Sequence, residues 1–193
     1  MRCAPPSMSA CKPAKPDDAQ GLAELVRSYR VHNQPNSLNE LEFFRKMPSF
    51  EVAIYHAGLA INRRDKRFSH QYRIPLAVLS RAKSLLAEKA PRLKTCRSFH
   101  ELHACLTKAL ASVRGIGELY TYDTALRLGA FLNLKPEHVY LHAGTRAGAR
   151  ALGFSVAAGY VEFSALPKAI QVLQPHEVED FLCIYKAHLQ HGS

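Results

Sequence analysis

The chain has 193 residues, of which 47% are hydrophobic and 22% charged, and it carries a formal net charge of +10. This balance is typical of a globular protein with a buried core, and no apolar run approaches the roughly 20 residues that cross a bilayer. The five cysteines are widely spaced and form no CxxC pair, which argues against a disulfide framework and a structural zinc site. We therefore expect a cytoplasmic protein without a membrane span or a metal site.

The beginning of the chain differs from the rest in composition. Residues 1–18 contain four prolines and no apolar region of a signal peptide, so we expect a disordered tail. Beyond it, apolar residues recur at helical spacing and strand signals are nearly absent, which predicts an all-α, multi-helix globular fold in a single domain over residues 19–193. A stripe from Leu22 to Tyr29 predicts the first helix. The capping-box pattern Ser37–Glu40 predicts the start of a second, which ends before Pro48.

Prolines and a second capping box organise the middle of the chain. Residues 50–61 are apolar and rich in small side chains, which indicates close packing. Pro75 is expected in the first turn of a helix that runs to about Ala90 and is stopped by Pro91. The pattern Ser98–Glu101 predicts the start of a further helix with one apolar face.

The C-terminal third is expected to be helical, with one short strand in the loop 154–164. The predicted helices are residues 118–133, 136–153, 166–173 and 175–189. Within the second of these, glycines and alanines line one face between His142 and Arg150. Close helix packing explains such a face; the alternative is a ligand admitted at Gly144 and Thr145, with His142 and Arg146 around it.

The positive charge is concentrated in one stretch. Thirteen Lys or Arg and three Asp or Glu lie between Ala60 and Arg114, which favours a polyanionic partner, either nucleic acid or an anionic membrane surface. A merely solvated basic face is the alternative. The loop 63–73 interleaves cations with Phe68 and Tyr72, a pattern suited to phosphates and bases. Its candidate nucleic-acid contacts are Arg63, Arg64, Lys66, Arg67 and Arg73.

A glycine-rich turn joins two predicted helices at the segment Val113-Arg-Gly-Ile-Gly117. Two glycines around one aliphatic residue allow a sharp turn and a close approach of the backbone to another surface. The N–H groups at the start of the following helix are unsatisfied and attract anions. Arg114, Gly115 and Gly117 are therefore candidate phosphate contacts; a ligand-free helix corner is the alternative.

These residues resemble the helix-hairpin-helix motif shared by DNA repair glycosylases, polymerases and nucleases. The resemblance implies a central hairpin that binds a DNA backbone phosphate without reading sequence, often beside a monovalent cation held by hairpin carbonyls. It implies no other cofactor. The catalytic lysine of the glycosylases is not matched, because Leu119 stands at its position. Their catalytic aspartate is not matched either in residues 136–142.

Three acidic or basic side chains near the hairpin are candidate catalytic residues, namely Glu137, His142 and Asp123. Asp123 also precedes Arg127 by four residues, the spacing of an ion pair on a helix surface; the alternative places both beside a pocket together with Tyr120. We expect a protein that binds nucleic acid, DNA in the first instance, rather than a membrane. The alternatives are a divergent DNA-repair-type enzyme, a glycosylase or nuclease, and a helical interaction protein with a purely structural hairpin.

Overall fold

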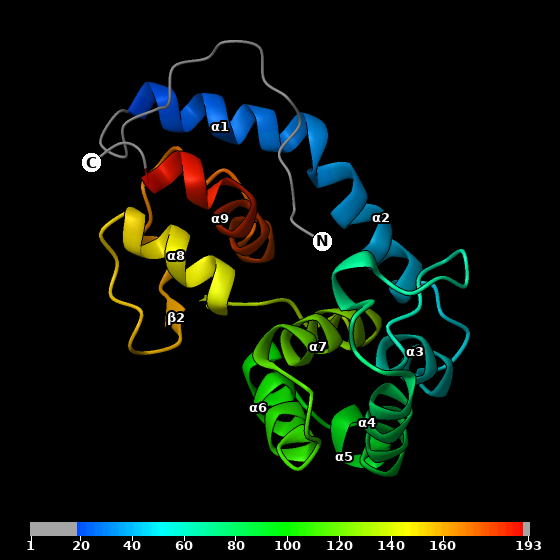
Figure 1. Cartoon of the computed structure of the whole chain (residues 1–193). Coiled ribbons are helices and arrows are strands. Elements are labelled where there is room, and N and C mark those ends of the chain that lie inside the picture. Colours follow the sequence, from blue (N-terminus) through cyan, green and yellow to red (C-terminus); the bar gives the residue numbers. More distant parts are fainter. Residues whose placement is uncertain (1–18, 191–193) are drawn as a thin grey trace. The chain divides into compact units, whose positions relative to one another are not determined.

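The structure is a computed structural model that describes residues 19–190, so the predicted tail over residues 1–18 lies outside the described residues. It confirms the all-α fold class, with one two-stranded sheet among the described residues. The described chain divides into two compact units (Figure 1), and the single domain over residues 19–193 stays a prediction. Unit 1 comprises residues 38–136, and unit 2 comprises residues 19–37 and 137–190 of the described chain.

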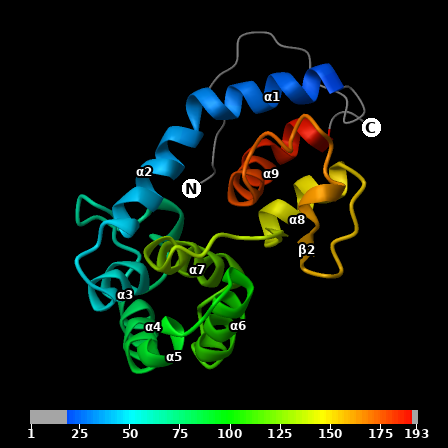
Figure 2. The same cartoon turned by 180° about the vertical axis from the view of Figure 1, so that it is seen from behind.

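Unit 1 is built from helices that share one apolar core. They are the end of α2 (Gln34–Arg45), α3 (Phe50–Gly58), α4 (Leu76–Glu88), α5 (Ala90–Lys94), α6 (Phe99–Leu110) and α7 (Glu118–Leu132). Helix α3 packs against α4 and α7, and α6 packs against α7; α6 and α7 lie side by side in both views (Figures 1 and 2). A Cβ atom at Gly58 would lie 2.8 Å from Lys83 Cα, so this glycine permits the close packing expected for residues 50–61.

Unit 2 surrounds α9 (Pro175–Gln190) with α1 (Ala19–His32) and α8 (Ala143–Ala151). Strand β1 (Val139–Tyr140) pairs with β2 (Tyr160–Val161) in antiparallel register, and β1 contacts α9. The apolar stripes predicted for α1 and α9 are buried, as shown by Tyr29 and Phe181, whose rings meet edge to face at 6.1 Å. Helix α8 packs so closely on α9 that a Cβ atom at Gly148 would lie 2.4 Å from the carbonyl oxygen of Leu182.

Several local predictions are confirmed by the backbone. Ser98 is the N-cap of α6 and accepts a hydrogen bond from the backbone N–H of Glu101 at 3.1 Å. Helix α7 ends one residue before the expected boundary, because Asn133 adopts a left-handed conformation with φ of 57°. The short strand expected in the loop 154–164 is β2.

Two helix boundaries were predicted wrongly, namely the start of α2 and the end of α4. Helix α2 begins at Gln34 rather than near Ser37, because Pro35 occupies the first turn, where its missing N–H is not needed. Ser37 therefore lies inside the helix and does not cap it. Helix α4 ends at Glu88, and Pro91 belongs to the first turn of the separate helix α5 instead of stopping α4.

Two predictions in unit 2 were also wrong. The helix expected from Pro136 begins only at Ala143, because Val139 and Tyr140 pair with β2 first. Residues 166–173 form turns rather than a helix. Leu166 precedes a proline, which disfavours helical torsions, and its ψ is 154°. The apolar spacing that suggested a helix reflects burial of Leu166, Ile170 and Leu173 from successive turns.

Candidate nucleic-acid interface

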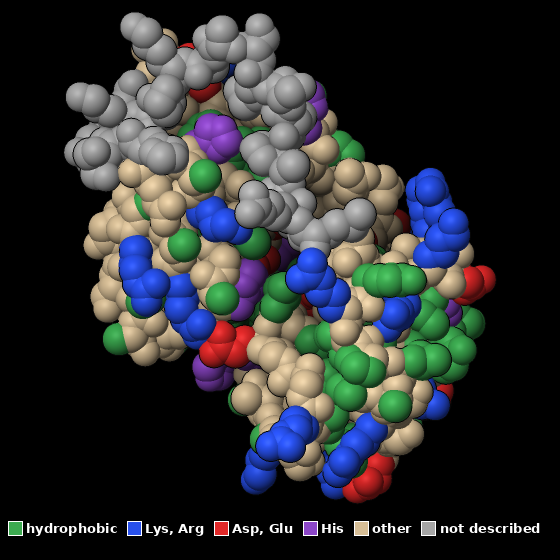
Figure 3. Space-filling view, in the orientation of Figure 1, with side chains coloured by type: hydrophobic (Ala, Val, Ile, Leu, Met, Phe, Trp, Pro, Cys, Tyr) green, Lys and Arg blue, Asp and Glu red, His purple; other side chains and the backbone are tan. Residues whose placement is uncertain are grey.

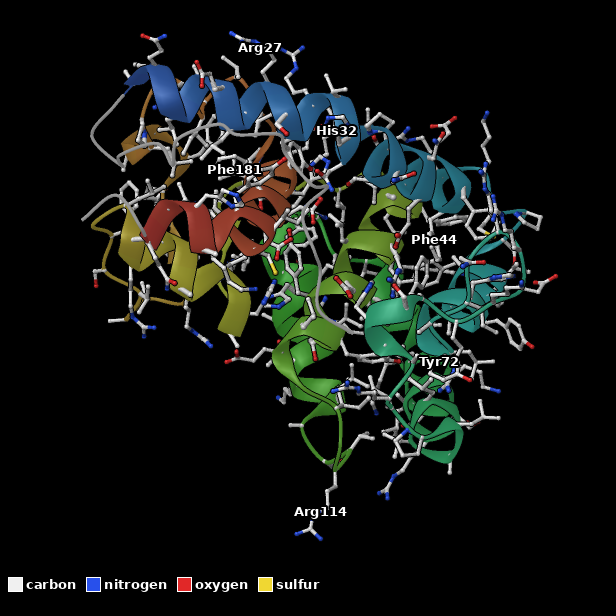
Figure 4. All side chains as sticks on the ribbon, turned by 45° about the horizontal axis from the view of Figure 1, so that its top comes forward. Arg27, His32, Phe44, Tyr72, Arg114 and Phe181 are labelled. Atoms are coloured by element: carbon white, nitrogen blue, oxygen red, sulfur yellow. The ribbon has the colours of Figure 1, made fainter. Side chains whose placement is uncertain are left out.

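The hairpin between α6 and α7 has the backbone that its glycines predict. Gly115 has a φ of 95°, a conformation that L side chains rarely adopt. Val113 is buried, and its carbonyl oxygen accepts the N–H of Ile116 at 3.1 Å, which closes the turn. Arg114 is exposed at the tip and points away from the ribbon (Figure 4).

The hairpin leaves the start of α7 open. Gly117 is the N-cap residue, and it has no side chain with which to cap the helix. A Cβ atom at Gly117 would meet no other atom within 4 Å. Since the first-turn N–H groups of a helix have no acceptor inside the helix, this end of α7 offers backbone donors to a ligand of negative charge.

The hairpin lies against the first turn of a second helix, α4. A Cβ atom at Gly115 would lie 3.5 Å from Cγ1 of Val78. The N-cap of α4 is Pro75, which likewise supplies no side-chain hydrogen bond. The loop 63–73 leads directly into this helix, so its last residues lie close in the chain to the part of α4 that the hairpin contacts.

The first half of the basic loop is a tight turn with its cations outward. The Oδ1 atom of Asn62 accepts the backbone N–H groups of Arg64 at 2.9 Å and Lys66 at 3.3 Å. Asp65 adopts a φ of 55° at the turn. Arg63, Arg64 and Lys66 are therefore exposed, and Arg73 is exposed at the other end of the loop.

A buried polar network fixes the second half of the loop to α7. The carboxylate of Asp123 accepts the side-chain amide of Gln71 at 2.7 Å and lies 2.8 Å from Nε2 of His70. Arg127 donates to Gln71 at 2.9 Å and to Glu40 at 2.7 Å, and its guanidinium lies 3.8 Å from the ring centroid of Phe68.

This network corrects the expectation of an ion pair on the surface of α7. The side chain of Arg127 is only 1% exposed, and its Nη2 atom is 3.8 Å from Asp123. Asp123, a candidate catalytic residue, holds the loop 63–73 in place. It lies six residues after Gly117, about 9 Å along the helix axis. The hairpin and the basic loop are thus both attached to α7.

The predicted cations of unit 1 form no ion pair with a described residue, and neither do Arg81, Lys83, Arg97, Lys108 and Lys135 of the same unit. The predicted cations are Arg63, Arg64, Lys66, Arg67, Arg73 and Arg114. The six remaining Lys or Arg of the unit lie within 4 Å of a carboxylate oxygen, as in the pairs Arg92–Glu101 and Lys94–Glu51. Figure 3 shows Lys and Arg side chains in blue beside hydrophobic side chains over the helices of unit 1.

The two other catalytic candidates, His142 and Glu137, belong to unit 2. His142 is buried, and its Nε2 atom meets the carboxylate of Glu179 on α9. Its backbone N–H donates to Thr145 Oγ1 at 2.7 Å. A Cβ atom at Gly144 would lie 2.6 Å from Cys183 Sγ, so the small-residue face of α8 packs on α9 rather than admitting a ligand. Glu137 is exposed ahead of β1.

Sequence reasoning missed two features of this interface. The loop contains two aromatic residues, and only the structure distinguishes them: Phe68 is half-buried under Arg127, whereas Tyr72 is 67% exposed. The partners of Arg127 were missed as well, because Glu40 lies 87 residues away in the chain. Pro75 in the sequence could have indicated the second helix without a side-chain cap, α4.

Among residues 19–190, no helix combines the length and apolarity required to cross a membrane. In the same residues, no group of three or more His, Cys, Asp or Glu side chains is placed to hold a metal ion. Comparison with protein-family models, with curated proteins and with solved structures gave no match for this chain.

Proposed function

We propose that unit 1 binds the phosphate backbone of nucleic acid, DNA in the first instance, through the hairpin and the basic loop. The observation that carries this proposal is the set of exposed cations without ion pairs on the loop and the hairpin, together with the uncapped N-terminus of α7. Arg63, Arg64 and Arg73 on the loop and Arg114 on the hairpin form no ion pair with a described residue.

Physical chemistry favours a phosphate as the ligand of this surface. Cations on a protein surface release condensed counterions when they meet a polyanion, which is the main source of sequence-independent affinity. Backbone N–H groups at Gly117 add directed donors for one phosphate. The monovalent cation implied by the helix-hairpin-helix resemblance belongs to the same proposal. Its ligands would be carbonyl oxygens of the hairpin.

The salt dependence of DNA binding tests the contribution of the loop. We expect the affinity of the full chain for a short duplex to fall steeply with salt, and the double variant Arg63→Ala/Arg64→Ala to flatten the log–log slope by about 1 for each cation removed. The matched control is Arg27→Ala, an exposed cation on α1 of unit 2, which should leave the slope unchanged. Affinity that does not respond to salt would contradict the proposal.

The variant Gly117→Val tests the hairpin. Gly117 has a φ of −111°, open to any residue, and an added Cβ meets nothing within 4 Å, so the fold should accept valine. A branched side chain at this position would cover the first-turn N–H groups, and we expect duplex affinity to fall by roughly tenfold or more. The measurement is fluorescence anisotropy, corrected for folded fraction by a thermal melt. Unchanged affinity in the folded variant would remove the hairpin from the interface.

A further inference from the structure

The ring of Tyr72 is an exposed aromatic surface held in a defined orientation. Tyr72 is 67% exposed, whereas the other aromatic residue of the loop, Phe68, lies against the buried guanidinium of Arg127. An exposed tyrosine on a flexible loop would lose its freedom on binding. Tyr72 directly follows Gln71, which is 2% exposed and bonded to both Asp123 and Arg127, so its backbone is already fixed.

One face of the Tyr72 ring is occupied by a cation. The Cζ atom of Arg67 lies 4.7 Å from the ring centroid, and its Nη1 atom donates to the carbonyl oxygen of Ile74 at 2.6 Å. This explains why Arg67, predicted as a phosphate contact, is half-buried in the loop. The hydrogen bond holds the guanidinium over the ring, and the strong exposure of Tyr72 leaves its other face available for a planar group.

Residues close to Tyr72 in the chain add exposed apolar area and positive charge. Leu76, the first residue of α4, is 61% exposed and lies four residues further along the chain. Arg73, adjacent to Tyr72, is exposed and forms no ion pair with a described residue. A planar, polarisable group attached to a phosphate matches both features. Nucleobases stack on tyrosine in this way, and an arginine on the ring adds a cation–π contribution.

We propose that Tyr72 is a stacking platform for one unpaired base, and that unit 1 prefers nucleic acid in which a duplex adjoins a single-stranded gap. The proposal rests on the proposed function, because the hairpin and the loop cations would bind the phosphate backbone of the nucleic acid. A base inside an intact duplex is covered on both faces by its neighbours and cannot reach the ring. A base in a gap has a free face, and its phosphate lies within reach of the loop cations.

The test compares two DNA probes in the same buffer, an intact duplex and the same duplex with a three-nucleotide gap. We expect the full chain to bind the gapped probe about tenfold more tightly, in keeping with the contribution of one stacked base. Tyr72→Ala should abolish this preference while retaining affinity for the intact duplex, and Tyr72→Phe should keep it. The matched control is Tyr55→Ala, because Tyr55 is also exposed, at 48%, and has Lys83 over its ring at 6.0 Å.

The outcomes separate this proposal from the one on which it rests. If both probes bind equally, with a salt slope that Arg63→Ala/Arg64→Ala flattens, the stacking platform is wrong and backbone binding stands. If neither probe binds, both proposals fail. A preference for the gapped probe that survives Tyr72→Ala, or that Tyr55→Ala also removes, would likewise overturn the assignment to Tyr72. Thermal melts of each variant keep a loss of folding apart from a loss of stacking.

Discussion

The two units of the chain use their charged residues in opposite ways. Unit 1 contains 17 Lys or Arg and 8 Asp or Glu, whereas the described residues of unit 2 contain six of each. In unit 2 the polar groups turn inward. Tyr29 donates to Asp180 at 3.1 Å, and Gln34 donates to Glu177 at 2.7 Å. Burial and the nearby Asp180 raise the pKa of the Tyr29 hydroxyl well above its ordinary value.

This difference separates charge that maintains the fold from charge that is left for a partner. The acidic groups of α9 connect that helix to α1, α2 and α8, and no excess of either sign remains in the described part of unit 2. Unit 1 also has one internal charged network, around Arg127. Its other cations exceed its carboxylates, and all cations of the loop and the hairpin except Arg67 are exposed. Like charges at a surface repel each other, so such an excess contributes little to folding and favours an anionic partner.

The largest effect is expected where unit 1 buries a charge. Arg127→Met would leave Glu40 and Asp123 without the guanidinium and would remove one of the two groups that bind Gln71 of the loop 63–73 to α7. Removing one partner of a buried ion pair costs about 3 kcal/mol or more, and urea unfolding measures the loss. Arg27→Met in unit 2 is the control; an exposed site should change stability by less than about 0.5 kcal/mol. A similar small change for Arg127→Met would mean that the network does not hold unit 1 together.

In unit 2 the corresponding weak point is packing rather than charge. Gly148→Ala would place a methyl group 2.4 Å from the carbonyl oxygen of Leu182, a backbone atom that cannot move aside. Overpacking of this kind costs about 1–3 kcal/mol. Gly144→Ala is the matched control, because its new methyl group meets the side chain of Cys183 at 2.6 Å, which can rotate. Neither variant should alter the salt slope of DNA binding. A changed slope would show that unit 2 takes part in the interface.

Sequence reasoning succeeded where structure is decided within a few residues. The stripe of α1 and the cap at Ser98 depend on neighbours in the chain, and both were predicted. It failed where distant segments decide. Strand β1 contains two residues, too few to show a period of two, and it was predicted as part of a helix. The burial of Arg127 depends on Glu40 and Gln71, which lie 87 and 56 residues away, so its spacing from Asp123 suggested a surface pair instead.

The two hairpin glycines allow a sharper separation of fold and function within unit 1. Gly115→Ala would force an L residue to a φ of 95°, which we expect to cost about 1–2 kcal/mol. Gly117→Ser has no such strain, and a serine at the N-cap can bond a first-turn N–H, so its effect should be neutral or slightly stabilising by about 0.5 kcal/mol. Thermal melts compare the two variants. Equal destabilisation would mean that both glycines serve only the turn.

The smallest effect concerns the response of unit 1 to acid. Unit 2 places its buried His142 against the carboxylate of Glu179, whereas His103 in unit 1 stacks on Phe99 with an interplanar angle of 6°. Burial lowers the pKa of His103, and the charge of His100 lowers it further. The folded chain therefore disfavours the protonated ring more than the unfolded chain does, whose histidine pKa is about 6.5. Stability from this group is complete above that pH and is lost as the pH falls through the folded pKa.

We expect His103→Phe, which keeps the stacking but cannot titrate, to reduce the loss of unfolding free energy between pH 7.5 and 5.5 by less than about 1 kcal/mol. His100→Gln, at an exposed position, should reduce it less. Urea unfolding at the two pH values measures the free energy of unfolding of both variants. If His103→Phe does not change the pH dependence of that free energy, protonation of His103 does not destabilise the folded state.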